Sequence, residues 1–236
     1  WMYRNYFMNK QNANLSEIAI IASEDTHYSI PKAANVLLLD WLKIPVDFET
    51  RSIDLLVLEN IIINAKKQGK KYFIVVSNMG TTMFGAIDNP SDYIDILEKH
   101  DLKYKLHVDA AYGGFVYPFS NKASEINFEN PKISSITIDA HKMLQAPYGT
   151  GVFICRKGLI ENVLTKEAEY VEGMDLTLCG SRSGSNAVAG AERHDARACC
   201  LDAVGAASRV RNERGLGGAA ECAGAGNCAG IILQGK

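Results

Sequence analysis

The sequence lacks the features that mark membrane-spanning, secreted and nucleic-acid-binding proteins. No uninterrupted apolar run approaches the ~20 residues that a helix needs to cross a bilayer, and the first residues lack the charged-then-apolar order of a signal peptide. There is no excess of positive charge either, because 25 Lys and Arg residues stand against 27 Asp and Glu residues, a formal net charge of -2. We therefore expect a soluble cytoplasmic chain with no nucleic-acid partner and no membrane partner.

Metal-binding cysteine pairs are missing as well. None of the six cysteines forms a CxxC pair with a matching His or Cys partner, so the spacing does not indicate a zinc site. Cys155 and Cys179 lie in the regularly patterned part of the chain, whereas the other four are crowded toward its end. We expect reduced thiols and no bound metal ion.

The two ends of the chain are unusual in composition. The chain begins at Trp1 with an amphipathic stretch over residues 1–10 that no N-cap residue precedes, so we expect an upstream part to be missing. After residue 189 there is no Phe, Tyr or Trp, and Ala, Gly, Arg and Cys dominate. So little apolar bulk cannot offset the ~1 to 2 kcal/mol per residue that ordering a backbone costs. We predict a folded large domain over residues 1–188 and a poorly ordered or non-native tail over residues 189–236.

Between the ends, short apolar runs of β-forming residues alternate with helical stretches. The predicted strands are 18–22, 72–77, 105–108, 135–138 and 151–155. The predicted helices, where apolar residues recur at three- and four-residue spacing, are 31–42, 52–68 and 90–100. This alternation predicts an α/β fold whose mostly parallel sheet is flanked by helices. The continuous apolar run 73–76 is typical of a strand covered on both faces.

Polar side chains follow four of the predicted strands. They are His27 after the first, Thr81 and Thr82 after the second, Asp109 at the end of the third, and His141 and Lys142 after the fourth. In a parallel sheet the carboxyl ends of the strands meet at one edge, where ligands collect. We therefore expect these side chains to face one crevice.

Two of these residues could carry chemistry together. Lys142 follows an apolar strand and should be partly desolvated, and a neutral amine is the form that attacks an aldehyde to give an imine. Asp109 lies in LHVDAAYGGF, whose small residues leave room for a flat ring. A buried carboxylate needs a cationic partner, which a protonated pyridine nitrogen would supply. Taken singly, an exposed lysine and a turn-forming aspartate are the commoner explanations.

Five motifs, in this order along the chain, resemble those of the group II pyridoxal 5'-phosphate (PLP) dependent amino-acid decarboxylases. They are THYSIPKAA, GTTMFGAID, HVDAAYGGF, SITIDAHKM and GSRSG, and the resemblance covers roughly residues 1–189. The archaeal tyrosine/aspartate decarboxylases look most similar. The resemblance implies the large domain of a fold type I, PLP-dependent transferase-like protein, PLP as cofactor, decarboxylation of an L-amino acid to its amine and CO2, and a homodimer.

The resemblance also implies roles for individual residues. Lys142 would carry PLP as a Schiff base, and Asp109 would pair with the ring nitrogen of PLP. His27 and Ala111 would lie on the two faces of the ring. His27, Asp109 and Lys142 would thus act in catalysis as well as in binding the cofactor.

Three further positions follow from the same resemblance. Thr82 would lie beside the cofactor, and His141 would contact its phosphate. Tyr170, in KEAEYVEG, would match the mobile-loop tyrosine that helps to protonate the product carbon.

The sequence departs from the family pattern at both ends. The Gly/Ser/Thr-rich phosphate-binding loop and the dimer-forming N-terminal segment are not found, and the tail replaces most of the usual C-terminal domain. Three alternatives therefore stay open: an aldehyde lyase, an aminotransferase, or an inactive fragment of a decarboxylase. The identity of the amino-acid substrate is also open.

Overall fold

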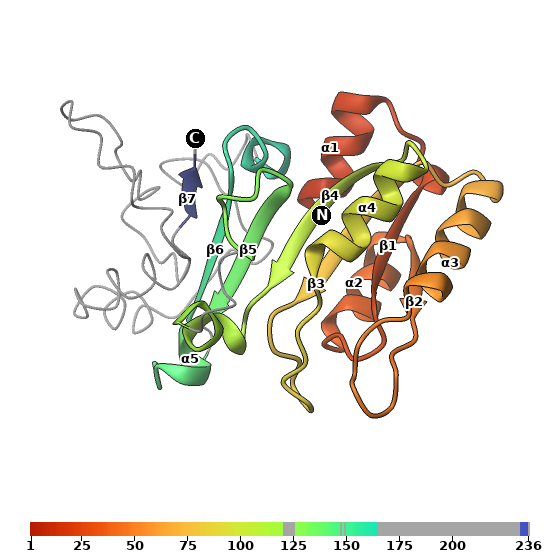
Figure 1. The fold of residues 1–236 in the computed structure, drawn as a ribbon. Helices are drawn as coiled ribbons and strands as arrows, with labels where there is room; N and C mark the ends of the chain where they lie inside the picture. Colours follow the sequence, from red (N-terminus) through yellow and green to blue (C-terminus); the bar gives the residue numbers. More distant parts are fainter. Residues whose placement is uncertain (120–125, 147, 149, 165–231, 236) are drawn as a thin grey trace.

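The structure is a computed structural model that describes residues 1–119, 126–146, 148, 150–164 and 232–235. A seven-stranded sheet forms its centre, in the order β2-β1-β3-β4-β5-β6-β7 (Figure 1). The strands are β1 Ile18–Ser23, β2 Asp40–Ile44, β3 Tyr72–Asn78, β4 Lys103–Asp109, β5 Ile133–Asp139, β6 Gly151–Arg156 and β7 Ile232–Gly235. The α-helices are α1 Met2–Gln11, α2 Ser29–Leu37, α3 Leu55–Lys67, α4 Pro90–Lys99 and α5 Ala140–Met143. Short 3-10 helices are η1 Leu15–Glu17, η2 Gly113–Phe115, η3 Tyr117–Phe119 and η5 Ile160–Val163.

Strand direction decides where a site can form. The neighbouring strands from β2 to β5 pair in parallel, whereas β6 pairs antiparallel with β5 and β7 pairs in parallel with β6. The expected mostly parallel, mixed sheet is therefore confirmed. Because β1, β3, β4 and β5 run the same way, the segments that follow them emerge at one edge of the sheet, called here the carboxyl edge.

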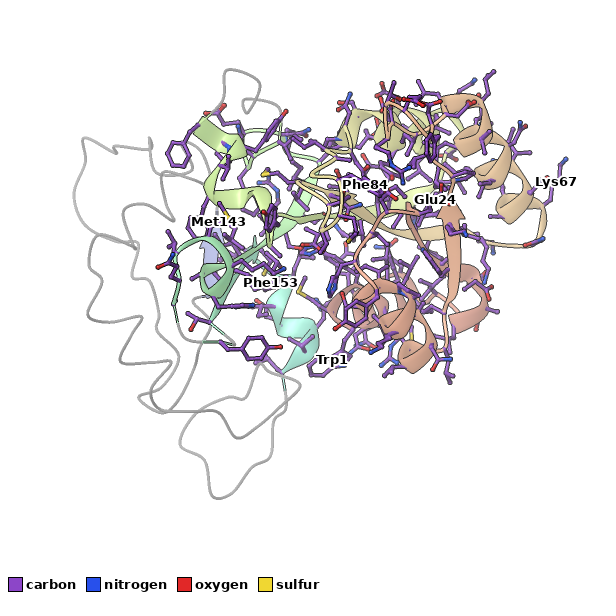
Figure 2. All side chains as sticks on the ribbon, turned by 90° about the horizontal axis from the view of Figure 1, so that it is seen from below. Trp1, Glu24, Lys67, Phe84, Met143 and Phe153 are labelled. Carbon is purple, nitrogen blue, oxygen red and sulfur yellow. The ribbon has the colours of Figure 1, made fainter. Side chains whose placement is uncertain are left out.

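Helices cover both faces of the sheet. In β3, Phe73 and Val75 belong to the core under α3 and α4, whereas Ile74 and Val76 belong to the core under α1 and α2. Figure 2 shows these two helix layers on opposite sides of the strands. All residues of β3 are buried, so the prediction of a strand covered on both faces is confirmed.

The helix predicted over residues 31–42 is partly wrong. Helix α2 ends at Leu37, because Leu38 takes the left-handed conformation, with φ 56°. The chain then enters β2, where Trp41 aligns with Ile20 of β1. The apolar spacing that suggested helix continues through this segment, but backbone pairing with β1 overrides it. Strand β2, at the edge of the sheet, could therefore not be predicted from local spacing.

The other helix predictions differ from the structure by only a few residues. Helix α3 begins later than predicted, at Leu55, because the Asp54 carboxylate caps it by accepting the backbone N–H of Leu56 (2.8 Å) and of Val57 (3.2 Å). Helix α4 begins at Pro90, as predicted from the fixed φ of proline.

Most of the predicted tail, residues 189–231 and 236, lies outside the described residues, and the division at residue 188 stays a prediction. Residues Ile232–Gly235 of that tail form β7, which lies beside β6. Cys155 is a buried free thiol, and the other cysteines lie outside the described residues. Within the described ranges, no helix is both long enough and apolar enough to cross a membrane.

Candidate active site

The polar residues singled out from the sequence all lie at the carboxyl edge. His27 is in the segment between β1 and α2, Thr81 and Thr82 are in the turn after β3, and Asp109 ends β4. His141 and Lys142 belong to α5, which follows β5 directly. Figure 2 looks onto this edge, where the labels of Glu24, Phe84 and Met143 mark the segments after β1, β3 and β5.

Asp109 keeps part of its acceptor capacity open. Its backbone lies in register between Asn78 of β3 and Thr137 of β5, and its side chain is half-buried. The Ala111 backbone N–H donates to Oδ1 at 3.1 Å. No other described residue donates a hydrogen bond to this carboxylate, so Oδ2 can accept one from a ligand.

The segment after β4 is held close to its neighbours on both sides. The Asp139 N–H donates to the Ala111 carbonyl at 3.3 Å, and the Gly113 N–H donates to the Met79 carbonyl at 3.0 Å. A Cβ atom at Gly113 would lie 2.2 Å from the Met79 oxygen, so this contact requires glycine. Asp109 and the start of α5 are therefore fixed at the ends of adjacent strands.

Lys142 is partly shielded from solvent and is held by a neighbouring carboxylate. Its side chain is 30% exposed, and its Nζ lies 3.2 Å from Asp139 Oδ2, three residues earlier. Asp139 was not among the site residues predicted from the sequence. The spacing in DAHK could have indicated it, since residues three apart on a helical turn face each other.

His141 has a fixed orientation beside Lys142. Its Nδ1 donates to the Thr150 carbonyl at 2.9 Å, which places a proton on Nδ1 because a carbonyl oxygen can only accept. Its Nε2 lies 3.8 Å from Asp139 Oδ2. The Asp139 carboxylate thus faces both His141 and Lys142.

His27 presents a half-buried imidazole at the same edge. Its Nδ1 is 2.8 Å from the Ser29 hydroxyl at the start of α2, and its ring centroid is 4.2 Å from that of Tyr28, with the planes inclined at 43°. The serine and tyrosine orient the ring and leave Nε2 without a hydrogen bond to any described residue.

The turn after β3 gives its two threonines different roles. Thr81 is buried, and its hydroxyl accepts the Ala86 backbone N–H at 3.1 Å, while its own N–H donates to the Ala86 carbonyl at 2.9 Å. Thr82 is exposed at the tip of the turn. Thr81 therefore closes the turn and Thr82 is the residue that a ligand can reach.

A buried polar cluster lies beneath this edge. Asp88 is 5% exposed, and its Oδ2 accepts hydrogen bonds from the Asn78 backbone N–H (2.9 Å), the Asn78 side-chain amide (2.7 Å) and the Ser23 hydroxyl (3.2 Å). Burial raises the pKa of Asp88 to about 6. The Asn78 side-chain oxygen accepts from the Thr26 hydroxyl at 3.1 Å, which connects this cluster to the segment that carries His27.

A basic hollow lies at the opposite edge of the sheet. Its wall includes Tyr6, Lys105, Lys132 and Arg156. Lys132 is paired with Glu98, Lys105 lies over the Tyr6 ring at 4.4 Å, and Arg156 donates to three backbone carbonyls. These cations are therefore already engaged by protein groups.

The carboxyl edge fits the pyridine cofactor that the sequence motifs imply. Asp109 can accept a hydrogen bond from a ring nitrogen, Lys142 offers a reachable amine on the adjacent strand exit, and His27 offers an imidazole face. These are the chemical types that bind a protonated aromatic ring bearing an aldehyde. Tyr170 lies outside the described residues.

Comparison with known proteins shows the family of the chain. Residues 4–180 match the model of the pyridoxal-dependent decarboxylase conserved domain. The chain is 59% identical over 189 residues to a tryptophan decarboxylase of Clostridium sporogenes, covering 80% of this chain and 45% of that protein. It is 37% identical over 169 residues to a probable L-tyrosine/L-aspartate decarboxylase of Methanocella arvoryzae, covering 71% of this chain and 43% of that protein. The chain thus spans less than half the length of these relatives.

Solved structures agree on the fold. The sphingosine-1-phosphate lyase of Burkholderia pseudomallei superposes with a TM-score of 0.64 at 21% identity, covering 86% of this chain and 44% of that chain. The glutamate decarboxylase domain of a Vibrio parahaemolyticus protein superposes with a TM-score of 0.53 at 26% identity, covering 64% of this chain and 34% of that chain. Together with the match to the family model, these findings confirm the family and the cofactor that the motifs implied: the chain belongs to the pyridoxal-dependent decarboxylases, whose cofactor is pyridoxal phosphate.

Proposed function

We propose that the whole protein decarboxylates an L-amino acid to its amine and CO2, and that L-tryptophan is its substrate. The observation that carries the reaction type is the placement of Asp109 and Lys142 at the ends of adjacent strands in a chain of this family. The substrate follows from the identity of 59% to a tryptophan decarboxylase, against 37% to a tyrosine/aspartate decarboxylase and 33% to a histidine decarboxylase.

Four residues would hold the reactive end of the cofactor. The amine of Lys142 would bind its aldehyde, and the carboxylate of Asp109 would pair with its ring nitrogen. His27 and Ala111 would flank the two faces of the ring. When bound, PLP supplies a ring that accepts the electron pair released as CO2 leaves.

Asp109 has the environment that this role requires. Its carboxylate is half-buried, and the N–H of Ala111 fixes it from one side at 3.1 Å. A charge held in place before the reaction stabilises developing charge without reorganisation, and this is usually the largest contribution to catalysis. Asp109→Asn should therefore lower kcat by roughly 100-fold or more, while near-normal turnover would exclude the role.

Lys142 and His141 would share the Asp139 carboxylate. Asp139 Oδ2, at 3.2 Å from the Lys142 Nζ, would orient the amine toward the aldehyde. His141 would contact the cofactor phosphate through the Nε2 side of its ring, since its Nδ1 is already engaged by the Thr150 carbonyl. Thr82, at the exposed tip of its turn, would lie beside the cofactor. Tyr170 would donate the proton that the product carbon takes up.

The finer expectations on assembly and location belong to the same proposal. We expect the whole protein to be a cytoplasmic homodimer, with residues 1–188 as part of its large domain. Size-exclusion chromatography with light scattering of the whole protein would measure the subunit number. A monomer that retains full activity would contradict the dimer.

Product analysis tests the proposed function directly. The whole protein, loaded with PLP, is incubated with L-tryptophan, L-tyrosine, L-histidine, L-aspartate and L-glutamate in turn, and CO2 and the amine product are measured. We expect CO2 and tryptamine from L-tryptophan. Borohydride should fix the cofactor on Lys142, as peptide mass analysis can check.

Two lysine variants give a matched comparison. Lys142→Ala should abolish amine formation, whereas Lys67→Ala, at an exposed position at the end of α3, should leave it unchanged. Bound PLP without CO2 release from any amino acid would refute decarboxylation and favour an aldehyde lyase or an aminotransferase. Failure to bind PLP would favour an inactive protein.

A further inference from the structure

Two irregular segments at the carboxyl edge carry residues proposed to contact the cofactor. The β1 loop, residues 24–28, carries His27, and the β3 turn, residues 80–86, carries Thr82. Neither His27 nor Thr82 is buried, and neither residue belongs to a strand or a helix. Backbone of this kind holds a catalytic geometry only where other groups fix it.

Arg51 contacts the β1 loop through a two-pronged ion pair. Its Nε donates to Asp25 Oδ2 at 2.9 Å, and its Nη2 donates to Asp25 Oδ1 at 2.5 Å. The Asp25 side chain is only 9% exposed and that of Arg51 is 20% exposed, so water screens the pair weakly. Two parallel N–H to oxygen bonds fix orientation as well as distance, which a lysine could not do.

The same guanidinium contacts the β3 turn. The central carbon of the Arg51 guanidinium lies 3.9 Å from the centroid of the Phe84 ring, an attractive contact between a cation and an aromatic face. Phe84 is two residues after Thr82, and Asp25 is two residues before His27. A single side chain therefore joins the two segments that carry the proposed cofactor contacts.

Arg51 is itself held by a closed turn before α3. Its N–H donates to the Asp47 carbonyl at 3.0 Å, and the Asp47 N–H donates to the Ser52 carbonyl at 2.9 Å. The Asp47 carboxylate accepts the Thr50 N–H at 2.7 Å. Arg51 takes the left-handed conformation, with φ 55°, which a residue other than glycine adopts only where its surroundings require it. The turn thus fixes the backbone from which the Arg51 guanidinium extends.

We propose that Arg51 is a positioning residue that sets the placement of His27 and Thr82 over the cofactor by joining the β1 loop to the β3 turn. The catalytic consequence rests on the proposed function. The mechanical consequence is that Arg51 holds the β1 loop and the β3 turn in place, and it does not rest on the proposed function. The two consequences can therefore be tested separately.

Hydrogen exchange of backbone amides tests the mechanical consequence without cofactor or substrate. In Arg51→Gln, residues 24–28 and 80–86 should exchange faster than in the wild type, whereas amides of α3 and α4 should not change. The control is Lys43→Gln, which removes a longer and more exposed pair to Glu24 of the same loop (3.9 Å, with the lysine 55% exposed), and it should leave both segments unchanged. Unchanged exchange of both segments in Arg51→Gln would overturn the proposal.

Cofactor affinity and kinetics test the catalytic consequence. Arg51→Gln should weaken PLP binding and lower kcat/KM by roughly 10- to 100-fold, the size of effect expected from a misplacement of about 1 Å. Arg51→Lys should recover little, because it keeps the charge but loses the fork and the flat contact with Phe84. Asp25→Asn should have a similar effect, and combining it with Arg51→Gln should add little, since the two residues act as a pair.

The outcomes separate the possible failures. A lower thermal unfolding midpoint with unchanged PLP affinity would show a purely structural role and overturn the proposal. If the wild type releases no CO2 from any amino acid but Arg51→Gln still weakens PLP binding, the positioning role stands and the proposed function fails. If PLP affinity and exchange both match those of the wild type, the positioning role fails whatever the activity.

Discussion

Asp88 is a buried carboxylate that has no cationic partner among the described residues, and this gives the protein a measurable pH dependence. Its hydrogen bonds come from Ser23 and Asn78, which are both neutral. The loss of hydration outweighs these bonds, and the nearby Asp25 carboxylate adds a smaller effect, so the pKa rises from 3.8 to about 6. Folding therefore disfavours the charged form of Asp88.

The sign and size of the effect follow from that pKa. Below pH 3.8 Asp88 is protonated in both the folded and the unfolded protein, so no penalty applies. As the pH rises through about 6, the folded protein must carry the buried charge and loses stability. A pKa rise of this size corresponds to roughly 3 kcal/mol at neutral pH. Asp88→Asn keeps an acceptor oxygen without the charge, so its free energy of unfolding should exceed that of the wild type by about this amount at neutral pH.

Urea unfolding of the wild type and of Asp88→Asn, across a pH series from acid to neutral, measures this difference. The gain of the variant should grow as the pH rises and disappear in acid. Asp88→Ala is the control, because it removes the acceptor as well as the charge. It should be less stable than Asp88→Asn by about 1 to 3 kcal/mol at every pH, since the donors of Asn78 lose their partner. A difference between wild type and Asp88→Asn that does not change with pH would refute the reasoning.

Three further changes have expected outcomes. Gly113→Ala would place a Cβ atom 2.2 Å from the Met79 oxygen. The free energy of unfolding should therefore fall by more than about 1 kcal/mol, and the absorbance of bound PLP should be lost. A fully stable variant would contradict the close contact. Asp139→Asn removes the carboxylate that orients the Lys142 side chain, so PLP should be captured more slowly in a stopped-flow absorbance assay. The thermal midpoint should hardly change, because a partly exposed pair contributes at most about 1 kcal/mol. Leu58→Ala opens a space in the core under α3, so the free energy of unfolding, measured by urea unfolding, should fall by about 2 to 5 kcal/mol. A smaller loss would show that the core collapses into the space.

Most of the sheet could be predicted from the sequence, because most of its strands are short apolar runs that are recognisable locally. The runs at β1, β3, β5 and β6 are apolar and short, and helical spacing separates β1 from β3 and β3 from β4. The placement of the polar residues at the carboxyl edge could be predicted from these runs, since the residues that follow parallel strands lie at that edge. Strand β2 was missed because DWLKI carries no strong local signal, and its pairing with β1 decides its state.

The contacts that organise the site could not be predicted in the same way. Arg51 and Asp25 are 26 residues apart, and Asp88, in the segment before α4, is 10 residues from Asn78 at the end of β3. Only Asp139 had a local signal, its three-residue spacing from Lys142. Periodicity reports which face of an element is buried, and it holds no information on which loops meet at an edge.

The sequence by itself determined the chemistry at hand, which is an amine, a carboxylate and an imidazole at three strand exits, and the family to which the motifs belong. Residue type and order are properties of the chain alone. The tertiary structure decided how those groups are held: the guanidinium of Arg51 between two loops, the buried acid Asp88 beneath them, and Asp139 between Lys142 and His141. The physical reason is that hydrogen bonds and ion pairs act over a few ångströms, so distant segments interact only after the sheet has brought them together.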